Sequence, residues 1–131
     1  MVLVDTSVLI DFFKGKKNTG TEKLKTVIVQ NVPFGITFHI YQEILQGAKT
    51  EKEFKSLKKY LETQTFYEPK VPRITYENAA KIYFDLRKRG LTVRSTIDCL
   101  IAQIAIENNL YLLESDKDFN TIAKVVELKF F

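Results

Sequence analysis

The sequence predicts an α/β fold in which helices cover a central, mainly parallel sheet. Short apolar runs alternate along the chain with longer segments of helical spacing, as strands do when crossover helices connect them. The three prolines fall between these periodic segments, and no repeat or Gly/Ser-rich linker divides the chain. With 131 residues, 45% of them hydrophobic, we expect a single domain over residues 1–131.

In the first half of the chain, apolar spacing predicts two strands and four helices. Val2–Val4 is short and wholly apolar, as buried strands are, and the chain is expected to turn into a helix around Asp5–Ser7. Pro33 separates the second helix from the second strand. The predicted elements are strands at 2–4 and 35–38 and helices through residues 8–13, 21–30, 41–48 and 51–63.

The second half begins with a segment broken by prolines, residues 66–74, which is predicted to be an irregular connection or a short strand. A helix through residues 79–86 should end near Gly90, since glycine commonly terminates helices. The remaining predicted elements are a strongly apolar helix at 97–106, a strand at 110–113, a short helix at 118–125 and a final strand at 127–130. In such folds the ligand site lies beyond the carboxyl ends of the strands.

Charge and composition favour a cytoplasmic protein with a polyanionic partner. The 20 basic and 16 acidic residues give a net charge of +4, with basic clusters at 14–17, 55–60 and 87–94. Solvated lysines on helix faces explain any one cluster equally well. No apolar run reaches the roughly 18 residues that span a bilayer, and the first residues lack a secretory signal. The lone Cys99 lies in an apolar run and is expected to be a core residue.

Two acidic residues lie at or just past the ends of apolar strands. Asp5 comes directly after VLV and Asp116 after LYLLES, so the two carboxylates converge if both strands are parallel and central. Asp5 has an alternative role as a helix N-cap, although Thr6 or Ser7 would cap equally well. Asp118 has the same alternative at the short helix that follows it.

Three further acids differ in how well they fit their helices. Asp98 lies on an apolar face, where a charge is costly unless it is paired or bound to a metal. A capping box with Ser95 explains Asp98 equally well, and the pattern does not decide between them. Glu43 lies beside the apolar stripe of its helix and Asp11 on the side away from it, so the pattern alone makes both solvated residues.

Converging carboxylates favour a divalent cation. Two unit charges about 4 Å apart repel by roughly 4 kcal/mol at an effective dielectric constant near 20, so the cluster either holds protons or binds a cation. Oxygen ligands favour Mg²⁺ or Mn²⁺, and no His/Cys spacing typical of zinc is present. If four of the 16 acidic residues form this cluster, the other 12 face 20 basic residues, and the rest of the chain has a net positive charge. An acidic metal pocket within a basic surface is typical of a nuclease.

Three segments together resemble a known family. The segments are VDTSVLIDFF at the start, YQEILQGA at 41–48, and RGLTVRSTIDCLIAQIAIENNLYLLESDKDF at 89–119. They resemble a PIN-domain ribonuclease of the VapC toxin type, in the expected order and over nearly the whole chain. The resemblance implies a three-layer α/β/α fold, Mg²⁺- or Mn²⁺-dependent cleavage of RNA by a metal-activated water, homodimerisation, and inhibition by a VapB-like antitoxin. A transfer RNA or a ribosomal RNA loop is the implied substrate.

The resemblance also implies which acids hold the metal. The first acid matches Asp5, the second is Glu43 of YQEILQG, bound directly or through water, and the third is Asp98 of IDCLIA. The fourth falls in ESDKDF and is assigned to Asp116, with Asp118 as an auxiliary acid. These four acids are also the expected catalytic residues.

Other residues are expected to support this site. The hydroxyls of Thr6 and Ser115 would hold the ligating carboxylates in place. Arg94 is expected either to contact RNA phosphate or to pair with an acid. Glu114 replaces the Thr or His often found after this strand, which affects local hydrogen bonding and not the metal site.

Two other functions remain open at the level of sequence. One is a PIN nuclease of RNA maturation or decay, with the same chemistry and no antitoxin. The other is a catalytically silent PIN-like binding module, in which the acids act as helix caps and paired surface charges. The two differ in their response to divalent metal, since only a functional site is stabilised by a bound ion.

Overall fold

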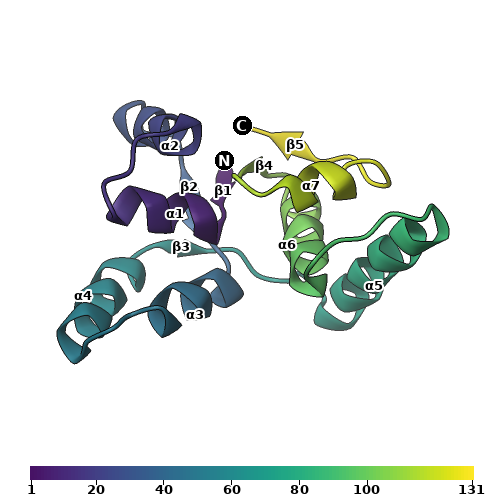
Figure 1. The fold of residues 1–131 in the computed structure, drawn as a ribbon. Helices are drawn as coiled ribbons and strands as arrows, with labels where there is room; N and C mark the ends of the chain where they lie inside the picture. Colours follow the sequence, from purple (N-terminus) through teal and green to yellow (C-terminus); the bar gives the residue numbers. More distant parts are fainter.

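The computed structural model describes residues 1–131 and contains one five-stranded sheet (Figure 1). All strand pairs are parallel, in the order β3-β2-β1-β4-β5, which confirms the predicted α/β class. The strands are β1 (Val2–Val4), β2 (Phe34–Ile36), β3 (Thr65–Phe66), β4 (Tyr111–Leu113) and β5 (Lys129–Phe130).

Seven helices flank this sheet and complete the predicted α/β/α arrangement. In Figure 1, α1 and α3 lie to the left of β1, and α6 and α7 lie to its right. The helices are α1 (Thr6–Phe13), α2 (Thr19–Val29), α3 (Phe38–Gln46), α4 (Glu51–Leu61), α5 (Pro72–Lys88), α6 (Thr96–Glu107) and α7 (Lys117–Ile122).

The centre of the sheet is buried as the sequence predicts. All three residues of β1 are at most 1% exposed, because β1 lies between β2 and β4 and its side chains belong to the hydrophobic core formed with the helices. Where β1 ends, the Asp5 backbone N–H donates a hydrogen bond to the Leu113 carbonyl at 2.9 Å. Phe119 of α7 is fully buried and fixes that short helix against the core. The carboxyl ends of β1 and β4 therefore lie side by side, next to the start of α7.

The structure corrects the predicted irregular segment at 66–74. Helix α5 begins at Pro72, because proline is well suited to the first turn, where its missing N–H would have no partner within the helix. Only Thr65–Phe66 is strand, so the connection between β3 and α5 is shorter than expected. The predicted strand at 35–38 also ends early, since the Thr37 hydroxyl accepts a hydrogen bond from Ile40 N–H and caps α3.

The remaining boundaries differ by only a few residues. Helix α1 already begins at Thr6, within the expected turn, and α7 ends at Ile122 instead of residue 125. Cys99 is buried in the core as predicted, and burial raises the pKa of its thiol to about 11. None of the helices combines the length and the apolar character that crossing a membrane requires.

Candidate metal centre

Asp5 is a buried carboxylate at the end of β1. It occupies the N-cap position of α1, but its side chain makes no capping hydrogen bond, so the capping role considered for it is not filled. The Ser7 hydroxyl donates to Asp5 Oδ2 at 3.3 Å. Asp5 is only 7% exposed, and this burial raises its pKa to about 6. The negative charges of Glu43 and, to a smaller extent, Asp116 also raise the pKa of Asp5. A carboxylate held in this way favours a cation.

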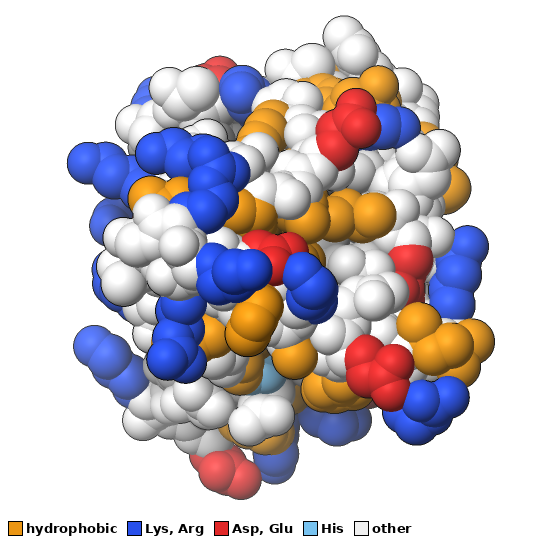
Figure 2. All heavy atoms as spheres, turned by 90° about the vertical axis from the view of Figure 1, so that its right-hand side faces the viewer, with side chains coloured by type: hydrophobic (Ala, Val, Ile, Leu, Met, Phe, Trp, Pro, Cys, Tyr) orange, Lys and Arg blue, Asp and Glu red, His pale blue; other side chains and the backbone are white.

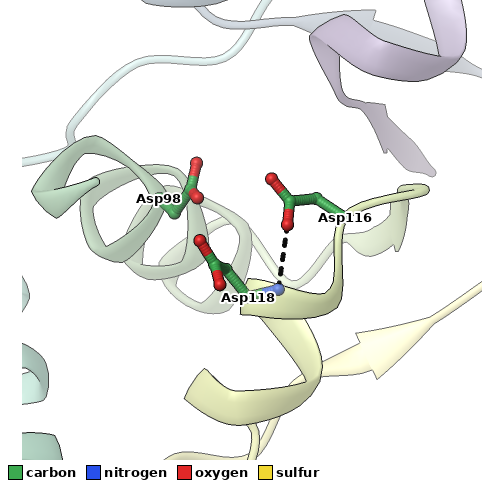
Figure 3. A group of neighbouring side chains, drawn as sticks. All are labelled: Asp98, Asp116 and Asp118. Carbon is green, nitrogen blue, oxygen red and sulfur yellow. Dashed lines mark hydrogen bonds between the residues drawn. The ribbon is translucent and has the colours of Figure 1, made fainter. Parts of the chain in front are cut away.

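Three aspartates form the centre of the site (Figure 3). Asp98 comes from the first turn of α6, Asp116 is the N-cap of α7, and Asp118 lies in the first turn of α7. One carboxylate oxygen from each lies within 4.8 Å of the other two. Asp116 Oδ1 accepts a hydrogen bond from the Asp118 backbone N–H at 3.0 Å, which fixes the spacing of these two acids. The structure thus brings both ESDKDF aspartates into one cluster with Asp98.

Asp98 has no partner within its own helix. The N-cap Ser95 accepts a hydrogen bond from Ile97 N–H at 3.2 Å, and the Asp98 carboxylate does not return a bond to Ser95. Burial raises the pKa of Asp98 to about 7, and the charges of Asp5 and Asp116 add to this effect. The capping-box alternative therefore does not hold, and Asp98 keeps its oxygens free.

Glu43 of α3 lines a cavity together with the three aspartates. This cavity of about 250 Å³ is bounded by Glu43, Asp98, Asp116 and Asp118, among others. The Thr6 hydroxyl donates to Glu43 Oε1 at 3.2 Å, so Thr6 supports an acid of the site as expected. Glu43 is partly buried, whereas its sequence pattern alone favoured a solvated glutamate.

Arg94 provides the positive charge within the acidic cluster. Its NH2 group contacts Asp116 Oδ1 at 2.8 Å, and its Nε contacts Asp118 Oδ2 at 3.3 Å. The Arg94 backbone N–H also donates to Asp118 Oδ2 at 3.0 Å. Of the two roles considered for Arg94, the structure shows pairing with acids. Its side chain is 79% exposed, so the guanidinium can leave without disturbing the core.

Two contributions to the site were not found from the sequence. Ser7 holds Asp5, and its signal was the hydroxyl two residues after the first acid. His39 Nε2 lies 3.2 Å from Glu43 Oε1, and the spacing of four residues on one helix was the signal for that pair. Ser7 and His39 therefore help to orient two carboxylates of the site.

Three residues outside the cluster match their expected places only in part. Ser115 lines an adjoining hollow with Ser7, but it makes no hydrogen bond to an acid of the site. Glu114 is half-buried, and burial raises its pKa. Asp11 lies 3.5 Å from Lys16 Nζ and accepts a hydrogen bond from Asn18, so it stabilises the segment after α1 and takes no part in the site.

The donor set fits a hard divalent ion. Three carboxylate oxygens within 4.8 Å of one another, with two more acids nearby, offer only oxygen ligands, as Mg²⁺ and Mn²⁺ prefer. Burial raises the pKa of Asp5 to about 6 and that of Asp98 to about 7, and the charges of neighbouring carboxylates add to this effect. A bound cation would remove this repulsion.

Comparison with known proteins agrees with this geometry. The sequence profile of the PIN domain matches residues 2–125. The chain belongs to the PIN-domain family. Two curated proteins that the chain is similar to are VapC ribonuclease Mb1587 of Mycobacterium bovis and ribonuclease VapC11 of Mycobacterium tuberculosis. Each is 28% identical over 130 residues, covering 98% of this chain and 96% of the relative.

Solved structures share the fold of this PIN domain. The VapBC2 complex of Rickettsia felis, bound to a promoter DNA fragment, matches with a TM-score of 0.75 at 17% identity, over 100% of this chain and 98% of that one. VapBC-1 of nontypeable Haemophilus influenzae matches with a TM-score of 0.74 at 20% identity, and the match covers 100% of this chain and 97% of that one. At these identities the likeness establishes the fold alone.

Replacing Arg94 by methionine is expected to tighten Mn²⁺ binding several-fold. The guanidinium competes with a cation for Asp116 and Asp118, and methionine removes that charge while keeping an apolar stem. Titration calorimetry on the metal-free protein measures the change. Arg89→Met is the matched control, because Arg89 carries the same charge but contacts the Lys124 carbonyl. Equal affinities for the two variants would contradict a direct competition.

Proposed function

We propose that this PIN domain is a Mg²⁺- or Mn²⁺-dependent endoribonuclease and the toxin component of a type II toxin-antitoxin system. The observation that carries the proposal is the meeting of Asp98, Asp116 and Asp118 at the carboxyl end of a PIN-type sheet. Asp5 and Glu43 complete the proposed set of metal-binding and catalytic acids. The naming of two relatives as VapC ribonucleases supports the activity.

The proposed site has five acids as metal ligands. Asp5, Asp98, Asp116 and Asp118 would hold the ion, with Glu43 binding directly or through water. When bound, a divalent ion draws in the phosphate, offsets charge on the phosphoryl group and activates water for in-line attack. The carboxylates are held in place for this purpose.

Neighbouring groups keep these carboxylates oriented. Ser7 fixes Asp5, and Thr6 and His39 hold Glu43 by the same oxygen. Arg94 pairs with Asp116 and Asp118, and a cation bound there would displace it. We propose that it then contacts a phosphate of the RNA, since it lies at the mouth of the site and is largely exposed.

The proposed partners follow from the family. The matched structures include VapBC complexes, which supports a VapB-like antitoxin for this chain. Homodimerisation and a cytoplasmic location are part of the same proposal. A transfer RNA or a ribosomal RNA loop is the proposed substrate, on the resemblance to VapC-type ribonucleases alone.

Incubation of the purified protein with total RNA tests the activity. With Mg²⁺ or Mn²⁺ we expect new 5′ ends at one dominant position, and with EDTA we expect none. Mapping these ends identifies the RNA. Intact RNA under all metal conditions, together with no thermal stabilisation by Mn²⁺, would contradict the proposal and favour a silent binding module.

Co-purification tests the toxin role separately. Expression from the native locus should yield a complex with the product of a small neighbouring reading frame, and that product should inhibit cleavage. Cleavage by a protein that purifies without such a partner would point to a nuclease of RNA maturation or decay. The mass of the purified protein in solution decides whether it is a dimer.

A further inference from the structure

A second cavity adjoins the acidic site. This aromatic groove of about 620 Å³ lies between α3, α5 and α6. Its walls include Phe38, His39, Gln42, Tyr76, Tyr83 and Ile97. His39 and Ile97 also line the acidic cavity, so the two cavities meet. A chain whose phosphate lies at the acids can therefore place its next group in the aromatic groove.

The walls of the groove are flat and exposed. Phe38 is 53% exposed and Tyr76 is 57% exposed, although both are large aromatic residues. Phe38 stacks on Phe66 with ring centroids 4.7 Å apart and planes 15° from parallel, so its orientation is fixed. Gln42 and Thr96 also line the groove, and their side chains make no hydrogen bond within the chain. Flat rings beside unused polar groups suit a nucleobase, which has an aromatic face and a polar edge.

The helix that forms one wall of the groove belongs to a segment with a net positive charge. Residues 72–94, which contain α5 and the segment after it, hold six Lys or Arg and two acidic residues, a net charge of +4. The whole chain also has a net charge of +4, so the remaining residues are neutral in sum. Figure 2 views the side on which α5 lies in Figure 1 and shows Lys and Arg side chains among apolar ones. This charge favours an anionic chain over a neutral apolar peptide.

We propose that the aromatic groove binds an unpaired nucleobase of the RNA, adjacent to the phosphate at which the acids act; this inference rests on the proposed function. The base stacks against Tyr76 or Phe38, and Gln42 and Thr96 face its polar edge. The basic side chains of residues 72–94 attract the phosphates on either side. Selection of unpaired RNA then comes from the groove, because a base within a duplex cannot enter it.

Substitution of a groove ring by a branched aliphatic residue tests the proposal. Tyr76→Leu keeps an apolar side chain but removes the flat surface, and we expect it to weaken binding of unpaired RNA roughly 5- to 50-fold. Fluorescence anisotropy with a short fluorescein-labelled single-stranded RNA, in EDTA to prevent cleavage, measures this loss. Phe84→Leu is the matched control, since Phe84 is 55% exposed on the same helix and does not line the groove. Its affinity for the RNA should equal that of the unchanged protein.

An abasic position in the RNA provides the second arm. In a set of RNAs that each carry one abasic position, one member should bind the unchanged protein more weakly than the intact RNA does. The same abasic RNA should bind Tyr76→Leu no more weakly than intact RNA does, because the missing base and the missing ring remove the same contact. Unchanged RNA affinity in both Tyr76→Leu and Phe38→Leu would overturn the proposal. If the same variants instead lost the co-purifying small partner, the groove would be a peptide site.

The result also separates this inference from the proposed function. A protein that cleaves RNA with Mn²⁺, and whose groove variants bind RNA normally, would refute the nucleobase site alone. A protein that neither binds nor cleaves RNA would refute both.

Discussion

Replacing Asp5 with asparagine is expected to abolish RNA cleavage and, in metal-free buffer at pH 8, to stabilise the fold. Cleavage should fall by roughly 100-fold or more, since removing even an outer partner of a metal ligand lowers metal affinity or activity about 10- to 100-fold. Asparagine has nearly the same shape and can still accept the hydrogen bond from Ser7. The substitution therefore removes a charge and leaves the packing of β1 intact.

The gain in stability follows from the pKa of Asp5. Burial raises this pKa from 3.8 to about 6, so the folded protein binds the Asp5 proton more tightly than the unfolded chain does. At pH 8 the carboxylate is ionised in both states, and ionisation costs more free energy in the folded state. At about 1.4 kcal/mol per pKa unit, the ionised carboxylate lowers the free energy of unfolding by about 3 kcal/mol. Asparagine avoids this penalty. The gain should shrink to a small fraction of this as the pH falls to 4, where Asp5 is protonated in the folded state and partly protonated in the unfolded state.

Urea denaturation at pH 8 and at pH 4 measures the change in stability, and the RNA assay measures activity. Asp11→Asn is the matched control, because Asp11 lies outside the site and pairs with Lys16. Its activity should be unchanged and its stability should differ by no more than about 0.5 kcal/mol. Cleavage by Asp5→Asn at the unchanged rate would remove Asp5 from the site.

Mn²⁺ is expected to raise the melting temperature by roughly 10 °C at pH 8 and by little at pH 5. At 100 times its dissociation constant a ligand contributes about 2.7 kcal/mol, and a chain of this size gains about 3–5 °C per kcal/mol. The pKa values of Asp5, about 6, and Asp98, about 7, explain the dependence on pH. At pH 8 both are ionised and free to bind, whereas at pH 5 protons occupy both.

The metal-free protein should show the opposite trend. Because both pKa values are raised in the folded state, its stability falls as the pH rises from about 4 through 6 and 7. Thermal melts with EDTA and with Mn²⁺ across this range test both trends. In Asp98→Asn the stabilisation by Mn²⁺ at pH 8 should largely disappear. An equal effect of Mn²⁺ at pH 5 and pH 8 in the unchanged protein would contradict a proton-competitive site.

The sequence was sufficient to place the acids at the carboxyl end of the sheet. Val2–Val4 and Tyr111–Leu113 are short apolar runs with few alternative structures, and each leads directly or within a few residues to an aspartate. Asp98 was conspicuous because it interrupts an apolar face. Strong local patterns of this kind survive folding because the core of a parallel sheet tolerates few exceptions.

Other features depended on geometry that no local pattern contains. Arg94 contacts two aspartates that lie 22 and 24 residues later in the chain. They are brought together by the course of the segment that connects α5 to α6, which no local sequence pattern describes. The start of α5 was missed because Pro72 was treated as an interruption, whereas proline at a first turn begins a helix. The aromatic groove is likewise invisible in the sequence, since its walls come from three helices.

The two edge strands of the sheet limit how a partner protein can bind. β3 and β5 are each only two residues long, so the rows of unpaired backbone groups at both edges are very short. A peptide that recognises its target by adding a strand needs a longer edge than this. Any protein that binds this chain tightly must therefore use side chains on its helical surfaces, where partner selectivity can change by substitution without altering the sheet.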